Sequence, residues 1–455
     1  MNNKNLLDTH AIVIGGSIAG LLAAHVLSNY FSQVTIIEKN QFPKEPLPRK
    51  GVPQSTQPHI LLTKGYRIIS EFFPDISAEL LQKGALTIDW GQEFNCFSEY
   101  GWFAHTLEPS ELISITCSRP LLEWAIREQI KKNTQIKFLE EHLVTGLIYN
   151  QKEHLISGVK IRSLSSKDEK KEIAQLVLDC SGRSSKTPQW LKDIGLTPPP
   201  ESIVDAYLGY ATRRYREPKN FQAPWKVMLI NHFPPEHPRL GYLAKIEQGE
   251  WIATLGGYEK DFPPTYNEGF LNFASSLRNP SFYQAIKEAE PISPIFAYRA
   301  TPNRLRHYEK CNLPSGFLVL GDAVCSLCPV YGQGMTVSAL STLVLQKWLS
   351  KSQKFIFTGL TQSLSSSSFQ KNLARNNYSH WNLATAQDSR FLKTKGKINP
   401  TFLEGLFQRY LQRLQVKATL DPMLYISFLE IAHSLKSPLN FFSPKLFWQL
   451  LKNPK

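Results

Sequence analysis

A chain of 455 residues is too long for one hydrophobic core, so we expect two or three domains. Its 42% hydrophobic and 20% charged content is that of a globular protein and excludes a disordered or fibrous chain. The net charge of +14 is spread along the whole sequence, and runs such as 167–172 (KDEKKE) mix both signs. This pattern favours a solvated surface, and we expect no nucleic-acid binding.

Six cysteines in this length make no disulfide framework, so we expect a reducing compartment and a cytoplasmic location. The apolar run 11–27 is similar to a signal-peptide core or a membrane span, but Gly15, Gly16 and Gly20 interrupt it. No other apolar run reaches the ~18 residues needed to cross a bilayer. The eleven histidines include no HxxxH or HExxH pattern, so no metal site is expected.

The first binding signal is a strand, a glycine-rich turn and a helix near the start of the chain. Residues 10–14 predict a short buried strand, 15–20 read GGSIAG, and 21–31 have helical spacing of apolar residues. A second strand, 34–39, contains Glu38 near its end. This order is typical of a β-α-β dinucleotide-binding unit.

Each residue type in the turn has a physical reason. Gly15 permits the tight turn, the small Ser17 lets the backbone approach a pyrophosphate, and Gly20 lets helix and strand pack closely. Ile18 and Ala19 open the helix, whose free N–H groups attract phosphate oxygens. The alternative is a glycine-rich turn that binds no ligand.

Glu38 narrows the choice of nucleotide. Its carboxylate can accept hydrogen bonds from ribose hydroxyls, whereas it would repel the 2′-phosphate of NADP. FAD or NAD is therefore favoured at this turn.

Two later strands also end in aspartate. In 175–191 (QLVLDCSGRSSKTPQWL), the predicted strand ends in Asp179, and Arg183 follows four residues later. In 316–322 (GFLVLGD), the predicted strand ends in Gly321 and Asp322. Either aspartate alone could be a helix cap or a turn residue. Together with the glycine turn, they indicate one cofactor held by three separated segments, as a dinucleotide with a long ribityl chain would be. No second GxGxxG follows, which disfavours a reductase with two dinucleotide domains.

The segment 321–336 (GDAVCSLCPVYGQGMT) also contains a Cys-x-x-Cys pair, Cys325 and Cys328. A redox dithiol of the thioredoxin-reductase kind would need a nicotinamide domain, for which the sequence shows no signal. We therefore interpret this segment as a cofactor-binding loop in which the cysteines are incidental.

The middle of the chain predicts an antiparallel sheet. Residues 204–216, 226–233 and 240–258 alternate as strands do, with a hairpin turn at Gln248 and Gly249. Six aromatic residues could line an apolar pocket there, although packing within the sheet is favoured for each: Tyr207, Tyr210, Tyr215, Trp225, Tyr242 and Trp251.

The last hundred residues predict helices. Residues 363–368 (SLSSSS) read as a polar linker, and 403–416 have apolar residues at helical spacing. The tail 424–455 is rich in aromatic residues and lysines. A packed helical cap is favoured there, with peripheral membrane contact as the alternative.

In these motifs and their order, the sequence resembles the group A, single-component FAD-dependent monooxygenases built like para-hydroxybenzoate hydroxylase. Within that group it is most similar in motifs to the bacterial flavin epoxidases of polyether biosynthesis, of the lasalocid type. The likeness covers roughly residues 10–350. It rests on these stretches: FPKEPLPRKGVPQSTQPHILL, YGWFAHTLEP, ITCSRPLLEWAIRE, DCSGRSS, YATRRYREP and GDAVCSLCPVYGQGMT.

The resemblance implies an α/β fold: a Rossmann-type FAD-binding domain, an antiparallel β-sheet substrate domain and a helical C-terminal region. We assign the domains as follows: 1–75, 115–187 and 297–350 to FAD binding, 76–114 and 188–296 to the substrate domain, and 351–455 to the C-terminal region.

The resemblance also implies the roles of individual residues. Arg49, with Lys50, would approach the pyrophosphate or ribityl region, Arg119 would face FAD from a helix start, and Val144 would offer its backbone to the adenine. The full set of implied FAD-binding residues is Gly15, Ser17, Ile18, Ala19, Gly20, Glu38, Lys39, Arg49, Lys50, Arg119, Val144, Asp179, Arg183, Gly321, Asp322, Gly334 and Met335.

Asp322 would bind the ribityl chain, and the segment from Pro329 to Met335 would lie beside the isoalloxazine, with Gly332, Gln333 and Gly334 as its flavin-facing residues. No side chain is named as a catalytic acid or base. Three residues depart from the epoxidase pattern: Gln57 and Gln333 stand in place of histidine, and Cys328 stands in place of asparagine. The two glutamines leave epoxidation less secure than oxygenation.

The implied reaction is oxygenation. FAD is reduced by NADPH or NADH, O₂ adds at flavin C4a, and one oxygen atom passes to an alkene or aromatic ring of a lipophilic substrate, in secondary metabolism. A separate partner flavin reductase stays open as the electron source. Alternatives are a flavin-dependent halogenase, an isoprenoid-type flavin reductase and a flavin-binding protein without catalysis. No two tryptophans lie two residues apart, which disfavours halogenases with a W-x-W-x-I-P stretch.

Overall fold

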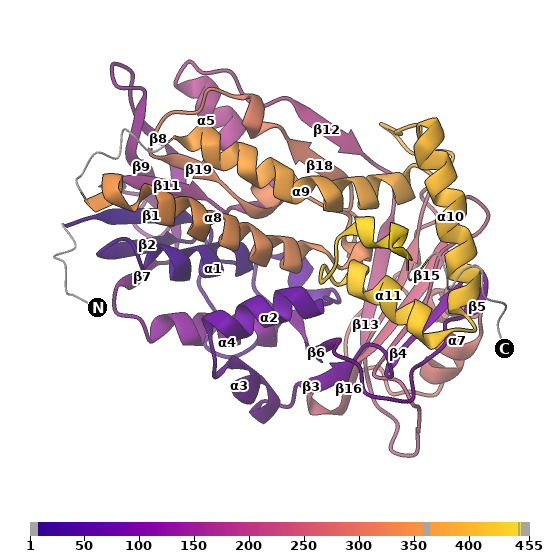
Figure 1. The fold of residues 1–455 in the computed structure, drawn as a ribbon. Coiled ribbons are helices and arrows are strands. Elements are labelled where there is room, and N and C mark those ends of the chain that lie inside the picture. The colour runs from indigo at the N-terminus through magenta and orange to yellow at the C-terminus, as the bar shows by residue number, and fades with distance from the viewer. Residues whose placement is uncertain (1–7, 358–364, 445, 447–455) are drawn as a thin grey trace.

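The structure is a computed structural model that describes residues 8–357, 365–444 and 446 (Figure 1). Its first layer is a parallel sheet of five strands in the order β19-β11-β1-β2-β7. The strands are β1 (His10–Ile14), β2 (Gln33–Ile37), β7 (Ile136–Leu139), β11 (Leu176–Asp179) and β19 (Phe317–Val319). Four of β1's five residues are buried, which matches a strand covered on both faces.

Helices cover this sheet, and one of them comes from far along the chain. In Figure 1, α8 lies against α1, although more than 300 residues separate them. The helices of this layer are α1 (Ile18–Leu27), α2 (Thr63–Phe72), α3 (Ile76–Gln82), α4 (Arg119–Lys131), α5 (Thr187–Asp193) and α8 (Gly334–Phe357).

Three small sheets surround the parallel sheet. Strand β8 forms the edge of the first, β10-β9-β8; the others are β3-β6 and β12-β18-β20. Their strands are β3 (Leu86–Asp89), β6 (Ile113–Thr116), β8 (His142–Asn150), β9 (Leu155–Ser163), β10 (Glu169–Ile173), β12 (Glu201–Val204), β18 (Asn303–Arg306) and β20 (Cys325–Ser326).

A large sheet of seven strands forms the second main layer, in the order β17-β13-β16-β15-β14-β4-β5. It is antiparallel except where β14 pairs with β4 in parallel. Its strands are β4 (Phe94–Ser98), β5 (Gly101–Trp102), β13 (Gly209–Arg216), β14 (Val227–Ile230), β15 (Arg239–Ile246), β16 (Glu250–Gly257) and β17 (Phe296–Tyr298). The hairpin between β15 and β16 is confirmed, with Gln248 and Gly249 at φ 63° and 64° in its turn.

The aromatic residues of this sheet are mostly core. Trp251 is fully buried and packs with Trp225 and Phe221. The same cluster includes Phe270 of α6 (Asn267–Ser275) and Phe282 of α7 (Ser281–Ile286). Packing within the sheet therefore explains these tryptophans better than a pocket does.

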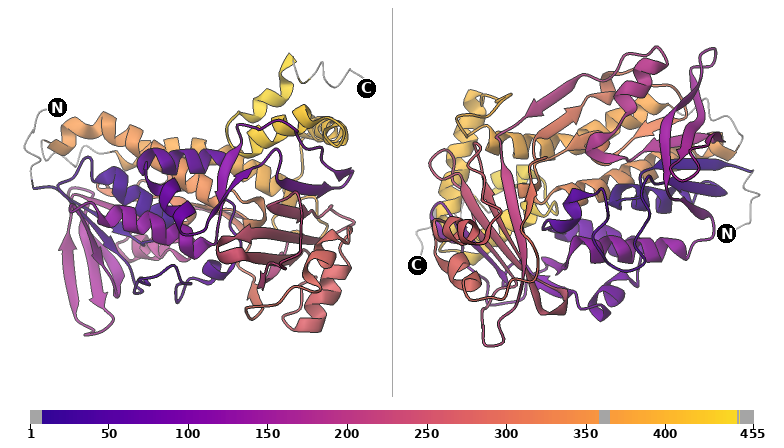
Figure 2. Two further views of the ribbon diagram at one scale, coloured as in Figure 1. Left: turned by 90° about the horizontal axis from the view of Figure 1, so that it is seen from below. Right: turned by 180° about the vertical axis from the view of Figure 1, so that it is seen from behind.

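Helix α9 (Ser366–Asp388) runs beside α8 and contacts β19 (Figure 1). The last two helices, α10 (Phe402–Ala418) and α11 (Pro422–Ala432), lie across the large sheet, at the end of the molecule opposite the β8-β9-β10 sheet (Figure 2). Leu414, Leu424 and Leu429 are buried in one cluster with Trp90 and Ile246, so the predicted helical cap is present over the described part of the tail. No helix in the described ranges is long and apolar enough to cross a bilayer.

Three of the expected domain divisions fall inside helices or strands of the structure. Strand β6 crosses the division at 114/115, β17 crosses that at 296/297, and α8 continues past residue 350 to Phe357 because no glycine or proline interrupts it there. The expected linker 363–368 lies partly outside the described residues, and its end is helical, since Ser365 caps α9 by accepting a hydrogen bond from the Ser368 N–H.

Candidate functional site

The glycine turn follows β1 and opens α1 at the carboxyl end of the parallel sheet. Gly15 has φ 98°, which favours glycine, and a Cβ there would lie 2.8 Å from the Cys180 carbonyl oxygen. A Cβ on Gly20 would lie only 1.9 Å from the Gly15 carbonyl oxygen. Both positions therefore require glycine, which fits a turn built for close backbone approach.

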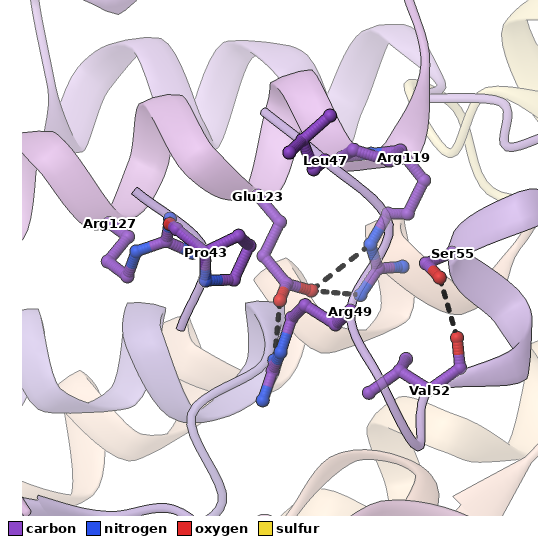
Figure 3. Close-up of a pocket in the computed structure, with 9 residues that line it drawn as sticks. Pro43, Leu47, Arg49, Val52, Ser55, Arg119, Glu123 and Arg127 are labelled. Atoms are coloured by element: carbon purple, nitrogen blue, oxygen red, sulfur yellow. Dashed lines mark hydrogen bonds and ion pairs between the residues drawn. The ribbon is translucent and has the colours of Figure 1, made fainter. Parts of the chain in front are cut away.

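Beside this turn lies a buried charge cluster, which we call the Glu123 cluster: Ser17, Glu38, Arg49, Arg119 and Glu123. Figure 3 shows the Glu123 carboxylate between the two guanidinium groups. Arg49 Nη1 lies 2.5 Å from Glu123 Oε1, and Arg119 Nη2 lies 2.9 Å from Oε2. Ser17 Oγ donates to Oε2 at 2.7 Å.

Glu123 is ionised in this setting. Burial alone would raise the pKa of its carboxyl, but Arg119 and Arg49 outweigh burial and lower this pKa to about 2. The side chain is 5% exposed, so little solvent screens these charges. The cluster therefore sets the two guanidinium groups against the carboxylates of Glu123 and Glu38 at the edge of the glycine turn.

Glu38 joins the cluster from the end of β2. Its carboxylate accepts hydrogen bonds from the Gly16 N–H at 2.9 Å and the Asn40 N–H at 3.1 Å, and it lies 2.9 Å from Arg49 Nη2. The structure thus brings together four residues that the sequence singled out separately. Lys39 and Lys50 are exposed beside them.

Sequence reasoning missed Glu123. It lies four residues after Arg119 on α4, a spacing that places both side chains on one face of the helix. That spacing could have indicated the pair, although nothing local indicates Arg49, which is 74 residues away.

Asp179 differs from the expectation. It is fully buried, and its carboxylate accepts hydrogen bonds from the Ser181 N–H, Ser185 Oγ and Thr187 Oγ1 at 2.6–2.8 Å. These bonds organise the turn between β11 and α5. We therefore assign Asp179 to holding this turn rather than to contacting a cofactor.

Arg183 connects that turn to the second aspartate motif. It donates to the carbonyl oxygens of Pro302, at 2.7 Å, and Leu327, and its Nε lies 4.0 Å from Asp322 Oδ2. The Asp322 side chain stays 33% exposed, so it remains open to a ligand. Partial burial raises the pKa of this carboxyl above its ordinary value, although the nearby Arg183 opposes the rise.

The loop after Asp322 leads into a long helix. Pro329–Tyr331 forms a single 3₁₀ turn, and Gly334 begins α8. Gly334 is exposed, and nothing lies within 4 Å of where its Cβ would be. The start of α8 can therefore offer backbone N–H groups to a ligand, whereas Met335 is 6% exposed and belongs to the core.

The two glutamines that replace histidine are held by protein groups. Gln57 Oε1 accepts a hydrogen bond from Thr212 Oγ1 at 2.7 Å. Gln333 Nε2 donates to the Ala432 carbonyl oxygen at 3.0 Å, and its Oε1 lies 2.9 Å from His380 Nδ1. These side chains fasten the loops to the sheet and to the C-terminal helices.

The cysteines of the loop are buried free thiols. Burial raises the pKa of both Cys325 and Cys328, so neither is a ready thiolate.

Val144 lies in β8, the edge strand of its sheet, beside the break in register between Val144 and Gly146. No group of three side chains in the described ranges could hold a metal ion.

Buried polar atoms in three of these segments have no hydrogen-bond partner in the described part of the chain: Arg49 Nε, Ser181 Oγ and Thr336 Oγ1. Such atoms are rare unless a ligand or water meets them. Arg49 Nε belongs to the Glu123 cluster and Ser181 Oγ to the turn after β11, whereas Thr336 Oγ1 faces Gly65 in the contact between α2 and α8. The cluster and the turn thus fit a polar ligand that spans them, as FAD would.

No family model matches the chain. Protein Rv3254 of Mycobacterium tuberculosis is 33% identical to it over 350 residues, which are 75% of this chain and 73% of Rv3254.

Solved structures with a similar fold include flavin-dependent oxygenases and halogenases. A triple mutant of the brominase Bmp2 aligns with a TM-score of 0.67 at 14% identity, over 97% of this chain and 99% of its own. Pseudomonas aeruginosa PqsL in complex with 2-aminobenzoylacetate aligns at 0.58 and 15%, over 92% and 98%. The myxobacterial chondrochloren halogenase CndH aligns at 0.61 and 15%, over 91% and 92%. The expected α/β fold is confirmed.

Proposed function

The chain belongs to the same family as Rv3254 and has the fold of flavin-dependent monooxygenases and halogenases, and from this premise we propose that it is an FAD-dependent monooxygenase. The substrate class that we propose is a lipophilic alkene or aromatic compound, with NADPH or NADH as the reductant. Epoxidation and hydroxylation both fall within this proposal.

The observation that carries the proposal is the convergence of four distant segments on one edge of the parallel sheet. The glycine turn, the Glu123 cluster, the exposed carboxylate of Asp322 and the open start of α8 all follow strands or begin helices at that edge. Ligands of open α/β sheets bind at the carboxyl ends of the strands.

When bound, FAD would supply the redox chemistry and the activation of O₂. The protein's part is binding and positioning. Arg49 and Arg119 would face the pyrophosphate, Glu38 the ribose, and Asp322 the ribityl chain. The N–H groups at Gly334 would stabilise negative charge that develops near the ring. No side chain needs to act as a nucleophile.

The test begins with the purified protein, FAD and NADPH or NADH in ¹⁸O₂, with polyene and phenol probes. We expect a yellow protein, substrate-stimulated NAD(P)H oxidation and one ¹⁸O atom in the product. A protein that takes up no FAD would overturn the whole proposal. Bound FAD without label in any product would overturn only the oxygenase part. A partner flavin reductase should be added before that second conclusion, because electrons could come from it.

Halogenation is the second candidate, because a brominase and a chondrochloren halogenase share the fold. The same reaction with bromide or chloride separates the two: a halogenated product without ¹⁸O supports the halogenase. An isoprenoid-type reductase would instead give a saturated product under anaerobic conditions.

A further inference from the structure

Behind the loop expected to face the flavin lies a buried carboxylate that the proposed function does not use. Asp388 ends α9 and is 2% exposed. Its Oδ1 accepts a hydrogen bond from Tyr331 Oη at 2.5 Å, and Tyr258 Oη lies 3.4 Å from the same oxygen. Its Oδ2 accepts from Asn303 Nδ2 at 2.6 Å.

Asn303 determines which oxygen of Asp388 can carry a proton. The Cys328 N–H donates to Asn303 Oδ1 at 2.7 Å, which fixes the orientation of the amide. The Asn303 amide nitrogen must therefore face Asp388 Oδ2 and donate to it. Oδ2 is thus an acceptor, and a proton on the carboxyl must sit on Oδ1, the oxygen that faces Tyr331.

Asp388 is held in surroundings that favour this proton. Burial, with a smaller contribution from Asp205, raises the pKa of its carboxyl to about 7, against the hydrogen bonds from Tyr331, Asn303 and Tyr258, which lower it. His232 stands behind Tyr258 and is uncharged near neutral pH, because burial and Arg390 lower its pKa to about 3.

The protonation state of Asp388 decides what Tyr331 can do. A tyrosine hydroxyl has one hydrogen to donate. When Asp388 is ionised, Tyr331 donates that hydrogen to Oδ1. When Oδ1 carries a proton, Asp388 donates to the tyrosine oxygen instead, and the Tyr331 hydrogen is free for another acceptor.

A second observation points to a ligand here. Tyr210 is 5% exposed and packs in one cluster with Tyr258, Cys328 and Phe391. Its hydroxyl has no hydrogen-bond partner in the described part of the chain. Such a group is costly to bury unless a ligand or water meets it. Tyr331 borders this aromatic cluster and is partly exposed.

We propose that Asp388 is a positioning residue that fixes the loop 328–331 through Tyr331 and Asn303 and, when protonated, frees the Tyr331 hydroxyl to donate to an oxygen atom of an otherwise apolar substrate. This inference rests on the proposed function only for its substrate part. The hydrogen-bond switch between Asp388 and Tyr331 stands without FAD.

The first test therefore uses the protein alone. We expect the infrared C=O band of a buried carboxylic acid to titrate with a midpoint near the pKa of about 7 and to be missing in Asp388→Asn. Tyr331→Phe removes a donor that favours the ionised form, so its midpoint should rise. The control is Asp193→Asn, an exposed carboxylate on α5, which should change neither. A band that does not titrate near neutral pH, or a midpoint that Tyr331→Phe leaves unchanged, would overturn the proposal.

The second test uses the FAD-loaded protein with a 4-alkylphenol as probe. In the wild type, kcat/KM should fall about tenfold above the pKa and then level off, since only protonated Asp388 frees Tyr331 to donate to the substrate. Asp388→Asn keeps an acceptor toward Asn303 and a donor toward Tyr331, so it should hold the acidic-side activity across the whole range. Tyr331→Phe should stay at that lower activity at all pH values, about tenfold below the wild type on the acidic side and equal to it on the alkaline side. A falling limb that persists in Asp388→Asn would refute the assignment. If that variant does not fold, the infrared midpoint of Tyr331→Phe decides.

Discussion

Glu123→Gln is the sharpest test of the Glu123 cluster. The substitution keeps the size of the side chain but removes the one anion that lies between Arg49 and Arg119, whose side chains are 5% and 12% exposed. Two buried guanidinium groups then face each other with Glu38 as their remaining nearby counter-charge. Breaking a buried ion pair in this way typically costs about 3–5 kcal/mol.

The pKa of Glu123 gives a second, independent value for the free energy that this carboxylate contributes to stability. Arg119 and Arg49 outweigh burial and lower the pKa from 4.5 to about 2, and each unit corresponds to about 1.4 kcal/mol, so ionised Glu123 contributes about 3 kcal/mol. Because the pKa is lower in the folded protein, this contribution is complete above about pH 4.5. It is lost as the pH falls through about 2.

The assay is urea unfolding of the FAD-free protein at several pH values. At pH 7 we expect Glu123→Gln to lower the free energy of unfolding by about 3 kcal/mol, and the gap should narrow toward about pH 3. The matched control is Glu128→Gln on the same helix, a side chain that is 31% exposed and paired with Lys131, which should cost under about 1 kcal/mol. Equal losses in both variants, or a gap that does not change with pH, would refute the reasoning.

FAD should protect Glu123→Gln more than the wild type, because the pyrophosphate would replace the missing anion. The rise in unfolding midpoint on adding FAD measures this effect. Equal protection of the two proteins would mean that the arginines do not face the phosphates.

The remaining predictions concern the other segments. Asp322→Ala should weaken FAD binding about 10- to 100-fold in a fluorescence titration while leaving the unfolding free energy unchanged, because its carboxylate is open to a ligand. The double variant Cys325→Ala, Cys328→Ala should keep the flavin absorbance and most turnover. Gly20→Ala should lose flavin absorbance, since the new Cβ would meet the Gly15 carbonyl oxygen at 1.9 Å.

Local patterns predicted the first β-α-β part of the fold well. A strand, a glycine turn, a helix and a second strand lie within residues 10–37, and their periodicity and glycines depend only on contacts within that stretch. The β15–β16 hairpin is predictable for the same reason. The parallel pairing of β14 with β4 is not, because it joins strands more than 120 residues apart.

The site was predictable only in part, because two charged residues with similar neighbours in the sequence can have different partners in the folded protein. Asp179 and Asp322 both leave a buried strand before a turn, yet one is fully buried and the other is open. The difference arises from Ser185 and Thr187, whose hydroxyls close over Asp179. Asp388 carries no local signal at all, since Tyr331 and Asn303 reach it from 57 and 85 residues away.

Arg183 shows why the separated motifs act together. Its guanidinium donates to the backbone carbonyl oxygens of Pro302 and Leu327 and lies beside Asp322. One side chain thus connects the turn after β11 to the segments before and after β20. Lysine could not make these contacts at once, because it lacks the planar fork of donors. The loop 328–331 is then fixed from two sides, by Arg183 at Leu327 and by Asp388 at Tyr331. A cofactor bound at Asp322 and a substrate held near Tyr331 would therefore be positioned by the same short segment.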